Sequence, residues 1–62
     1  MELTDETLIE DLEVGNQFYL AGSAYIKTNM IHKETGNIYC CHETSGVMYI
    51  FPGNTEVEKL CN

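Results

Sequence analysis

The chain contains no arginine and no tryptophan, and only three lysines stand against ten acidic residues, for a net charge of −7. DNA- and RNA-binding proteins need several Lys or Arg contacts to phosphates. Anionic membrane surfaces likewise attract basic segments. The near absence of positive charge therefore predicts that the chain binds neither polymeric nucleic acid nor a membrane.

Long apolar runs are also missing, because no stretch approaches the ~18 residues that a membrane span requires. The first residues are acidic, whereas a secretory signal begins with a basic segment. The chain has three cysteines, an odd number that does not suggest a disulfide framework. Together these absences predict a cytoplasmic protein.

Negative charge is concentrated at the start of the chain. Six of the ten acids lie within residues 1–13, and the remaining residues carry a net charge of only −1. A chain of 62 residues forms at most one domain. We therefore expect a single domain, 1–62, in which an acidic helical arm (1–13) precedes a nearly neutral body (14–62).

Residues 4–12 read as a short helix. Thr4 is a possible N-cap, and Asp5 and Glu6 follow in the first turn, where carboxylates stabilise the helix dipole. Thr7 offers an alternative start, because an acidic residue follows it at capping-box spacing. The apolar stripe that would dock the helix consists of Leu8, Ile9 and Leu12.

The body consists of short runs rich in Tyr, Ile, Val, Thr and Phe, which favour strands. The runs span residues 17–20, 24–32, 37–43, 47–51 and 55–60. Five short strands are too few for a sandwich of two large sheets, and a closed barrel removes exposed edges. The predicted fold is mainly β, with a short N-terminal helix and a five-strand, small SH3-like or OB-like barrel.

Two turns end in glycine, at residues 34–36 and 44–46, which is typical of three-residue hairpin loops with a left-handed glycine. In such a loop His32 would pair with Ile38. The turns belong to a ten-residue repeat, His-x-x-x-Gly-x-x-Tyr, that begins at His32 and again at His42. The repeat raises the possibility of an aromatic platform in which one face carries Tyr25, Tyr39 and Tyr49.

Catalytic groups are sparse. Cys40 and His42 share a strand face, but nothing nearby suggests a helix N-terminus that would lower the thiol pKa. His32 would join them across the hairpin, yet the spacing lacks the paired ligands of a structural zinc site. No phosphate-binding glycine loop and no nucleophile-elbow motif is present. We expect no enzyme activity, no metal and no cofactor.

Six aromatic residues are more than so small a core requires, which favours a binding surface. Tyrosines and neighbouring polar groups would hold a planar ligand such as a nucleobase, and backbone amides of the glycine turns would take its phosphates. The same aromatics are explained equally well if they are ordinary strand residues and part of a dimer interface. The candidate ligand-binding residues are Tyr25, Lys27, Asn29, Tyr39, His42, Tyr49, Asn54 and Thr55.

Three segments resemble small barrel proteins of tailed bacteriophages. They are an L-x-V-G-x-x-F entry that begins at Leu12, a T-S-G-V-M-Y-I-F segment at residues 44–51, and the T-E-V that begins at Thr55. The resemblance implies a protein that acts in the cytoplasm of an infected bacterial host cell. Some such proteins counter antiviral defence as oligomers that sequester nucleotide signals.

Three functions remain open. The first is a non-enzymatic counter-defence protein that sequesters a host nucleotide second messenger as a homo-oligomer. The alternative is an acidic inhibitor that binds a host protein through the N-terminal helix. The third is a structural accessory domain without a ligand. The partner-binding residues of the alternative are Glu6, Glu10, Asp11 and Glu13.

Overall fold

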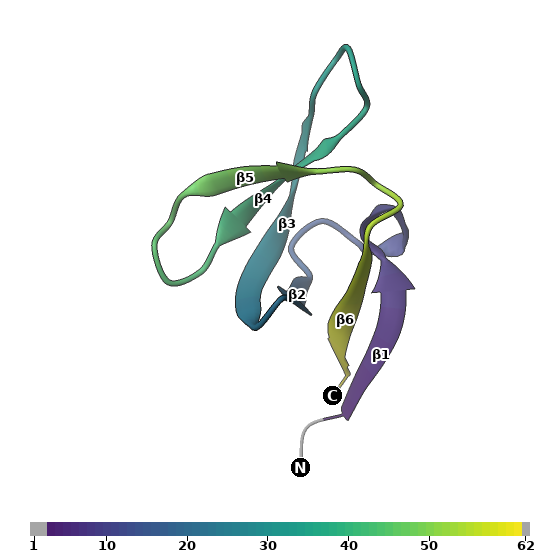
Figure 1. Ribbon diagram of the computed structural model, residues 1–62, viewed down its shortest axis with the longest axis vertical. Helices are drawn as coiled ribbons and strands as arrows, with labels where there is room; N and C mark the ends of the chain where they lie inside the picture. Colours follow the sequence, from purple (N-terminus) through teal and green to yellow (C-terminus); the bar gives the residue numbers. More distant parts are fainter. Residues whose placement is uncertain (1–2, 62) are drawn as a thin grey trace.

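Short runs rich in aromatic and β-branched residues build one antiparallel sheet in the computed structural model, which describes residues 3–61 (Figure 1). Within these residues the sheet has six strands and the order β1-β6-β2-β3-β4-β5. The elements are β1 (Leu3–Leu8), the 3₁₀ turn η1 (Ile9–Asp11), β2 (Gln17–Leu20), β3 (Ser23–Ile31), β4 (Ile38–His42), β5 (Met48–Phe51) and β6 (Glu56–Cys61).

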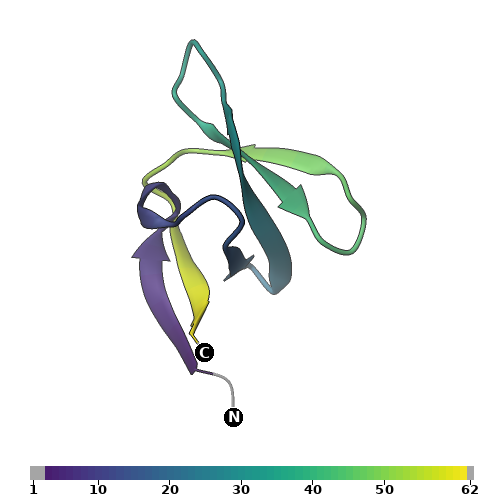
Figure 2. The same ribbon diagram turned by 180° about the vertical axis from the view of Figure 1, so that it is seen from behind.

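Strands β2 to β5 form a meander of successive hairpins, and β6 then returns between β1 and β2. The start of β1 and the end of β6 lie at one end of the molecule, and the β3–β4 hairpin projects at the other (Figures 1 and 2). The sheet order leaves β1 and β5 as its two edges, so the sheet is open. The mainly β prediction is confirmed, but the structure has six strands in an open sheet and not a five-strand barrel.

The predicted helix over residues 4–12 is wrong. Residues Leu3–Leu8 form β1, which pairs with β6, and only Ile9–Asp11 adopt a helical turn. An isolated helix of two turns is marginal, whereas pairing with β6 satisfies the backbone of β1. Residues 3–8 of the acidic segment are therefore an integral part of the sheet. Within residues 3–61 no helix is long and apolar enough to cross a membrane.

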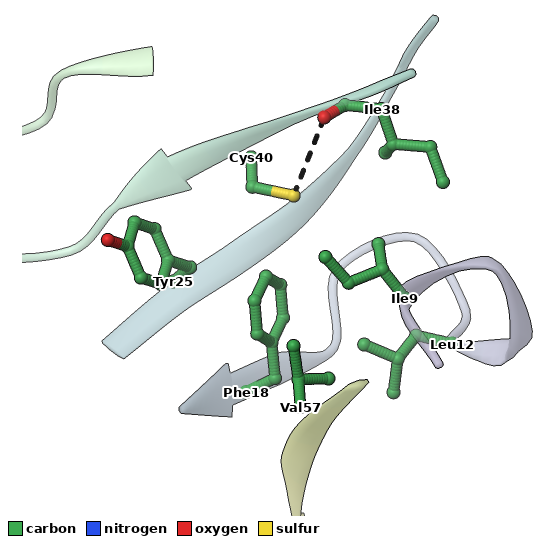
Figure 3. Close-up of a cluster of buried hydrophobic side chains, with 7 residues drawn as sticks. All are labelled: Ile9, Leu12, Phe18, Tyr25, Ile38, Cys40 and Val57. Carbon is green, nitrogen blue, oxygen red and sulfur yellow. Dashed lines mark hydrogen bonds between the residues drawn. The ribbon is translucent and has the colours of Figure 1, made fainter. Parts of the chain in front are cut away.

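Among the side chains that the structure describes, the core is a single cluster of seven on the inner face of the sheet (Figure 3). Phe18 lies at its centre and is fully buried, as are Ile9 and Cys40. Ile9 and Leu12 cover the cluster from the η1 side, so the apolar stripe predicted for a helix is buried by a single turn. The remaining members are Tyr25, Ile38 and Val57.

The two glycine turns are four-residue loops, one residue longer than predicted. In the first, the His32 amide donates to the Asn37 carbonyl and the Gly36 amide donates to the His32 carbonyl, both at 2.8 Å. His32 therefore pairs with Asn37, and Ile38 pairs with Ile31 instead. The predicted left-handed conformation is confirmed, because Gly36 and Gly46 both have φ of +74°.

Side chains explain the longer loops. In the first turn the Thr35 hydroxyl lies 3.3 Å from His32 Nδ1 and accepts the Asn37 amide at 3.2 Å. In the second turn the Ser45 hydroxyl lies 3.0 Å from His42 Nδ1. The repeat therefore encodes a structural cap in which a histidine ring and a hydroxyl hold the loop, as in an ST-turn.

Candidate functional site

A β-bulge in β3 forms one wall of the candidate site. Lys27 pairs with Cys40 and Ile31 pairs with Ile38, so three residues of β3 lie opposite Tyr39 alone. The Thr28 hydroxyl bridges the interruption: it donates to the Tyr39 carbonyl at 2.7 Å and accepts the Met30 amide at 3.2 Å. Bulges bend strands and redirect side chains. Here the bulge turns Asn29 out of the ladder, where it is exposed.

The bulge faces a cavity of about 620 Å³. Its other walls are residues 35–37 of the β3–β4 loop and residues 52–54 of the β5–β6 loop, and Glu10 and Val14 complete the lining. The β5–β6 loop and η1 lie side by side in Figures 1 and 2. A volume of this size is within the ~300–1,000 Å³ that small-molecule sites occupy.

Lys27 anchors η1 to β3. Its ammonium group donates to the Leu12 carbonyl at 2.5 Å and to the Glu10 carbonyl at 3.5 Å. These carbonyls lie at the end of a helical turn, where backbone acceptors lack partners within the helix. Lys27 therefore positions the η1 wall of the cavity, and its charge is already shared with protein oxygens.

The β5–β6 loop is tied to η1 through the backbone. The Glu10 amide donates to the Gly53 carbonyl at 2.9 Å, and the Ile9 amide donates to the Thr55 carbonyl at 3.1 Å. A Cβ at residue 53 would lie 3.2 Å from Glu10 Oε2, so glycine allows the close approach. Thr55 contributes backbone hydrogen bonds to this loop and does not line the cavity, so the structure does not bring it together there with the other predicted ligand residues.

The eight predicted ligand residues separate into distinct groups. Lys27, Asn29 and Asn54 meet at the cavity. Tyr25, His42 and Tyr49 meet elsewhere, in an aromatic cluster whose ring centroids are 5.1 Å apart for Tyr25–His42 and 5.6 Å apart for Tyr25–Tyr49. Tyr25 is buried at the centre of this cluster, so its ring packs the core and is not free to stack on a ligand.

Tyr39 lies outside both groups. Its neighbours Ile38 and Cys40 are buried on the inner face, and strand alternation places Tyr39 on the opposite face. It pairs with Ile50, whereas Tyr49 pairs with Cys40. The suggested platform of three tyrosines on one face is therefore wrong, because Tyr39 lies on the opposite face of the sheet from Tyr25 and Tyr49.

Several cavity residues were missed in the sequence, above all Thr28, Asn37 and Gly53. One signal was available: Thr28 and Asn29 are adjacent polar residues that interrupt the alternation of an apolar strand run. Such an interruption indicates a bulge. No comparable local signal marks Asn37 and Gly53, because the fold brings their loops together.

Charge in the cavity is nearly balanced. Glu10 and Lys27 both line it, and Lys27 is engaged with backbone carbonyls. The amides of Gly36 and Gly46 donate within their own loops, so they do not offer the phosphate site that was predicted. The cavity therefore suits an uncharged group.

The four residues predicted to bind a partner do not share a helical face. Glu6 lies on β1, Glu10 and Asp11 lie on η1, and Glu13 follows it; all four are exposed. Glu6 faces Glu58 directly across the β1–β6 pair. Glu6, Glu56 and Glu58 line a separate groove of about 440 Å³ beside the β2–β3 turn.

Cys40, Cys41 and His42 are not arranged as a reactive group. Burial raises the pKa of the Cys40 thiol to about 11, and nearby Lys27 only partly opposes this effect. His42 Nδ1 accepts a hydrogen bond from the Ser45 amide and also lies within hydrogen-bond distance of the Ser45 hydroxyl. Cys40 and Cys41 are free thiols. Within the described part of the chain, no group of three or more His, Cys, Asp or Glu residues is arranged to hold a metal ion.

Comparison of the chain with protein-family models, curated proteins and solved structures gives no match.

Proposed function

We propose that the chain is a non-enzymatic binding protein that sequesters a small nucleotide-type ligand, whose base occupies the cavity at the β3 bulge. The observation that carries the proposal is the convergence of Lys27, Asn29 and Asn54 on one cavity of about 620 Å³. Apolar side chains of Val14 and Ile31 line the same cavity. Apolar walls with a few convergent polar groups are typical of small-molecule sites.

The amide groups of Asn29 and Asn54 supply donors and acceptors suited to the edge of a base. Because the cavity itself holds balanced charge, phosphates contribute little to affinity. The biological setting that we propose is the one implied by the phage resemblance, in which a homo-oligomer in an infected bacterial cell removes a host nucleotide second messenger from solution.

A thermal-shift panel tests this function. The ligands are cyclic nucleotides, ADP-ribose-type nucleotides and the corresponding nucleosides. A ligand at about 100 times its Kd stabilises the folded state by about 2.7 kcal/mol, which gives a clear rise in Tm. We expect nucleosides to bind within about tenfold of their nucleotides, because the base makes the main contacts.

Variants locate the site. Asn29→Ala and Asn54→Ala should each weaken binding by about tenfold, the effect of losing one hydrogen bond. Thr44→Ala, in the exposed β4–β5 loop, is the matched control and should bind normally. A panel without any shift, or a shift that both asparagine variants retain in full, would overturn the proposal.

The acidic inhibitor is the second candidate, and Glu6, Glu56 and Glu58 beside one groove favour it. Like charges directly opposite each other destabilise a strand pair, so binding to a basic host protein would relieve that repulsion. Such binding should weaken by about tenfold or more from low to high salt and should survive Asn29→Ala.

A further inference from the structure

The two edges of the sheet differ in character. The β1 edge carries the charged residues Asp5 and Glu6, which discourage pairing with another strand. The β5 edge, defined here as residues 47–51, carries no charge. Its large apolar side chains are exposed, by 51% for Val47 and 41% for Ile50. An exposed apolar edge strand is a template for strand addition.

Hydrogen-bond alternation shows which backbone groups are available at this edge. The His42 amide donates to the Val47 carbonyl, so residue 47 turns its polar groups toward β4. Hydrogen-bonded and non-hydrogen-bonded positions alternate along an antiparallel pair. Tyr49 and Phe51 therefore also face β4, whereas Met48 and Ile50 direct their N–H and C=O groups away from the sheet.

We propose that two copies of this chain pair in antiparallel fashion through the β5 edge, with Tyr49 of each copy opposite Tyr49 of the other. In this register Met48 of one copy and Ile50 of the other exchange backbone hydrogen bonds, which gives four bonds about a twofold axis. Side-chain pairs across the junction are then all uncharged, including Val47 with Phe51.

Neighbouring symmetric registers are less favourable. Pairing centred on Met48 would need the Gly46 amide, which already donates to the His42 carbonyl. Pairing centred on Ile50 would need an amide from Pro52, which has none. Only in the register centred on Tyr49 do Met48 and Ile50 each make two backbone hydrogen bonds to the other copy, one through the N–H group and one through the C=O group.

Charge supports a second copy as the occupant, and the size of the edge limits how strongly it binds. A net charge of −7 opposes self-association through most surfaces, but residues 47–51 contain no charged side chain to repel an identical strand. Pairing of so short an edge covers less than the ~800 Å² per partner of a standard interface. The dimer is therefore expected to be reversible and dependent on concentration.

This interface deepens the proposed function, because it identifies the contact of the proposed homo-oligomer. It lies on β5, whereas residues 52–54 at the cavity belong to the following loop. Self-association and ligand binding are measured separately. Loss of one without the other distinguishes failure of the interface from failure of the ligand site.

Sedimentation equilibrium of the whole chain tests the dimer, from about 10 μM to 1 mM, the range suited to a weak interface. We expect the mass to rise from 7.0 kDa toward twice that value. Ile50→Pro removes an amide that faces away from β4, and with it two of the four bonds, so Kd should rise by at least about tenfold. Ile50→Val keeps the amide and should dimerise.

Met48→Lys places two cations at the junction and should also abolish the dimer. Met30→Lys is its matched control, because Met30 is 55% exposed and lies on β3. Circular dichroism checks that each variant is folded. A chain that stays at 7.0 kDa throughout, or a dimer that Ile50→Pro and Met48→Lys leave intact, would overturn the proposal.

Covalent trapping tests the register itself. Tyr49→Cys, in a background with Cys41→Ser and Cys61→Ser, should form a disulfide-linked dimer with oxidised glutathione, because directly opposed residues lie within disulfide range. Val47→Cys in the same background should cross-link at least about tenfold more slowly. Equal rates at both positions would contradict the register centred on Tyr49.

Discussion

At the scale of single residues, backbone conformation is set by a few special positions. Glycines at the ends of the β3–β4 and β4–β5 loops indicated left-handed conformations in the sequence, and both have φ of +74°. Ala21 is different, since its φ of 52° is unusual for a residue other than glycine. Nothing in the sequence marked Ala21 as strained, because the conformation follows from the β2–β3 register.

The β2–β3 turn therefore offers a stabilising substitution. Leu20 pairs with Ser23, and Ala21 and Gly22 between them both have positive φ, as in a type I′ turn. Asparagine tolerates this conformation better than alanine. We expect Ala21→Asn to raise the free energy of unfolding by about 0.5–1 kcal/mol and Tm by several degrees in thermal unfolding.

Ala21→Val provides the opposite control, because a β-branched side chain resists positive φ and should lower Tm. A lower Tm for Ala21→Asn, or equal Tm values for the two variants, would contradict the turn assignment.

At the scale of elements, the local pattern identified strands well where their partners are close in the chain. The run at 17–20 coincides with β2, and the later runs match β3 to β6 to within a residue or two. Residues 4–12 were misread because their apolar stripe is compatible with a helix. Their actual partner, β6, lies some fifty residues away. Only some of the cavity residues were predicted, because the cavity forms between loops that are distant in the sequence.

Lys27 is the link between β3 and η1, and its replacement should show how much that link contributes. Lys27→Met keeps the apolar stem but leaves the Leu12 and Glu10 carbonyls without their donor. We expect a loss of about 1–3 kcal/mol in urea-induced unfolding, the penalty for leaving the part-buried Leu12 carbonyl unsatisfied, since the contact with the Glu10 carbonyl is exposed.

Lys33→Met is the matched control for Lys27→Met, because Lys33 is exposed in the β3–β4 loop. It makes the same change in net charge and should alter stability by no more than about 0.5 kcal/mol. Similar losses in the two variants would show that the ammonium group of Lys27 does not support η1.

At the scale of the whole molecule, charge is distributed by element. Acidic residues gather on β1, η1 and β6, while residues 47–51 carry no charge. The sequence predicted a separation of charge but assigned it to a helical arm. In the structure Glu6 lies within the sheet and directly opposes Glu58, whereas Glu10 and Asp11 lie on η1.

Glu6→Lys should stabilise the fold, because it converts this like-charge pair into an attractive one. The expected gain is about 0.2–1 kcal/mol at low salt, measured by urea unfolding. The gain should shrink at high salt, where charges are screened beyond a few ångströms. Glu34→Lys, in the exposed β3–β4 loop, makes the same change in net charge and is the control. Equal gains would assign the effect to net charge alone.

The pairing of β1 with β6 has a consequence for how the molecule assembles. The β3–β4 hairpin closes a four-residue loop, whereas the Leu8–Glu56 pair closes one roughly ten times longer. Loop-closure entropy grows as about (3/2)RT ln n, so the second closure is disfavoured by about 2 kcal/mol more. The meander is thus expected to form first and the terminal strands to join last. Because η1 follows β1 directly, the cavity is complete only after this final step.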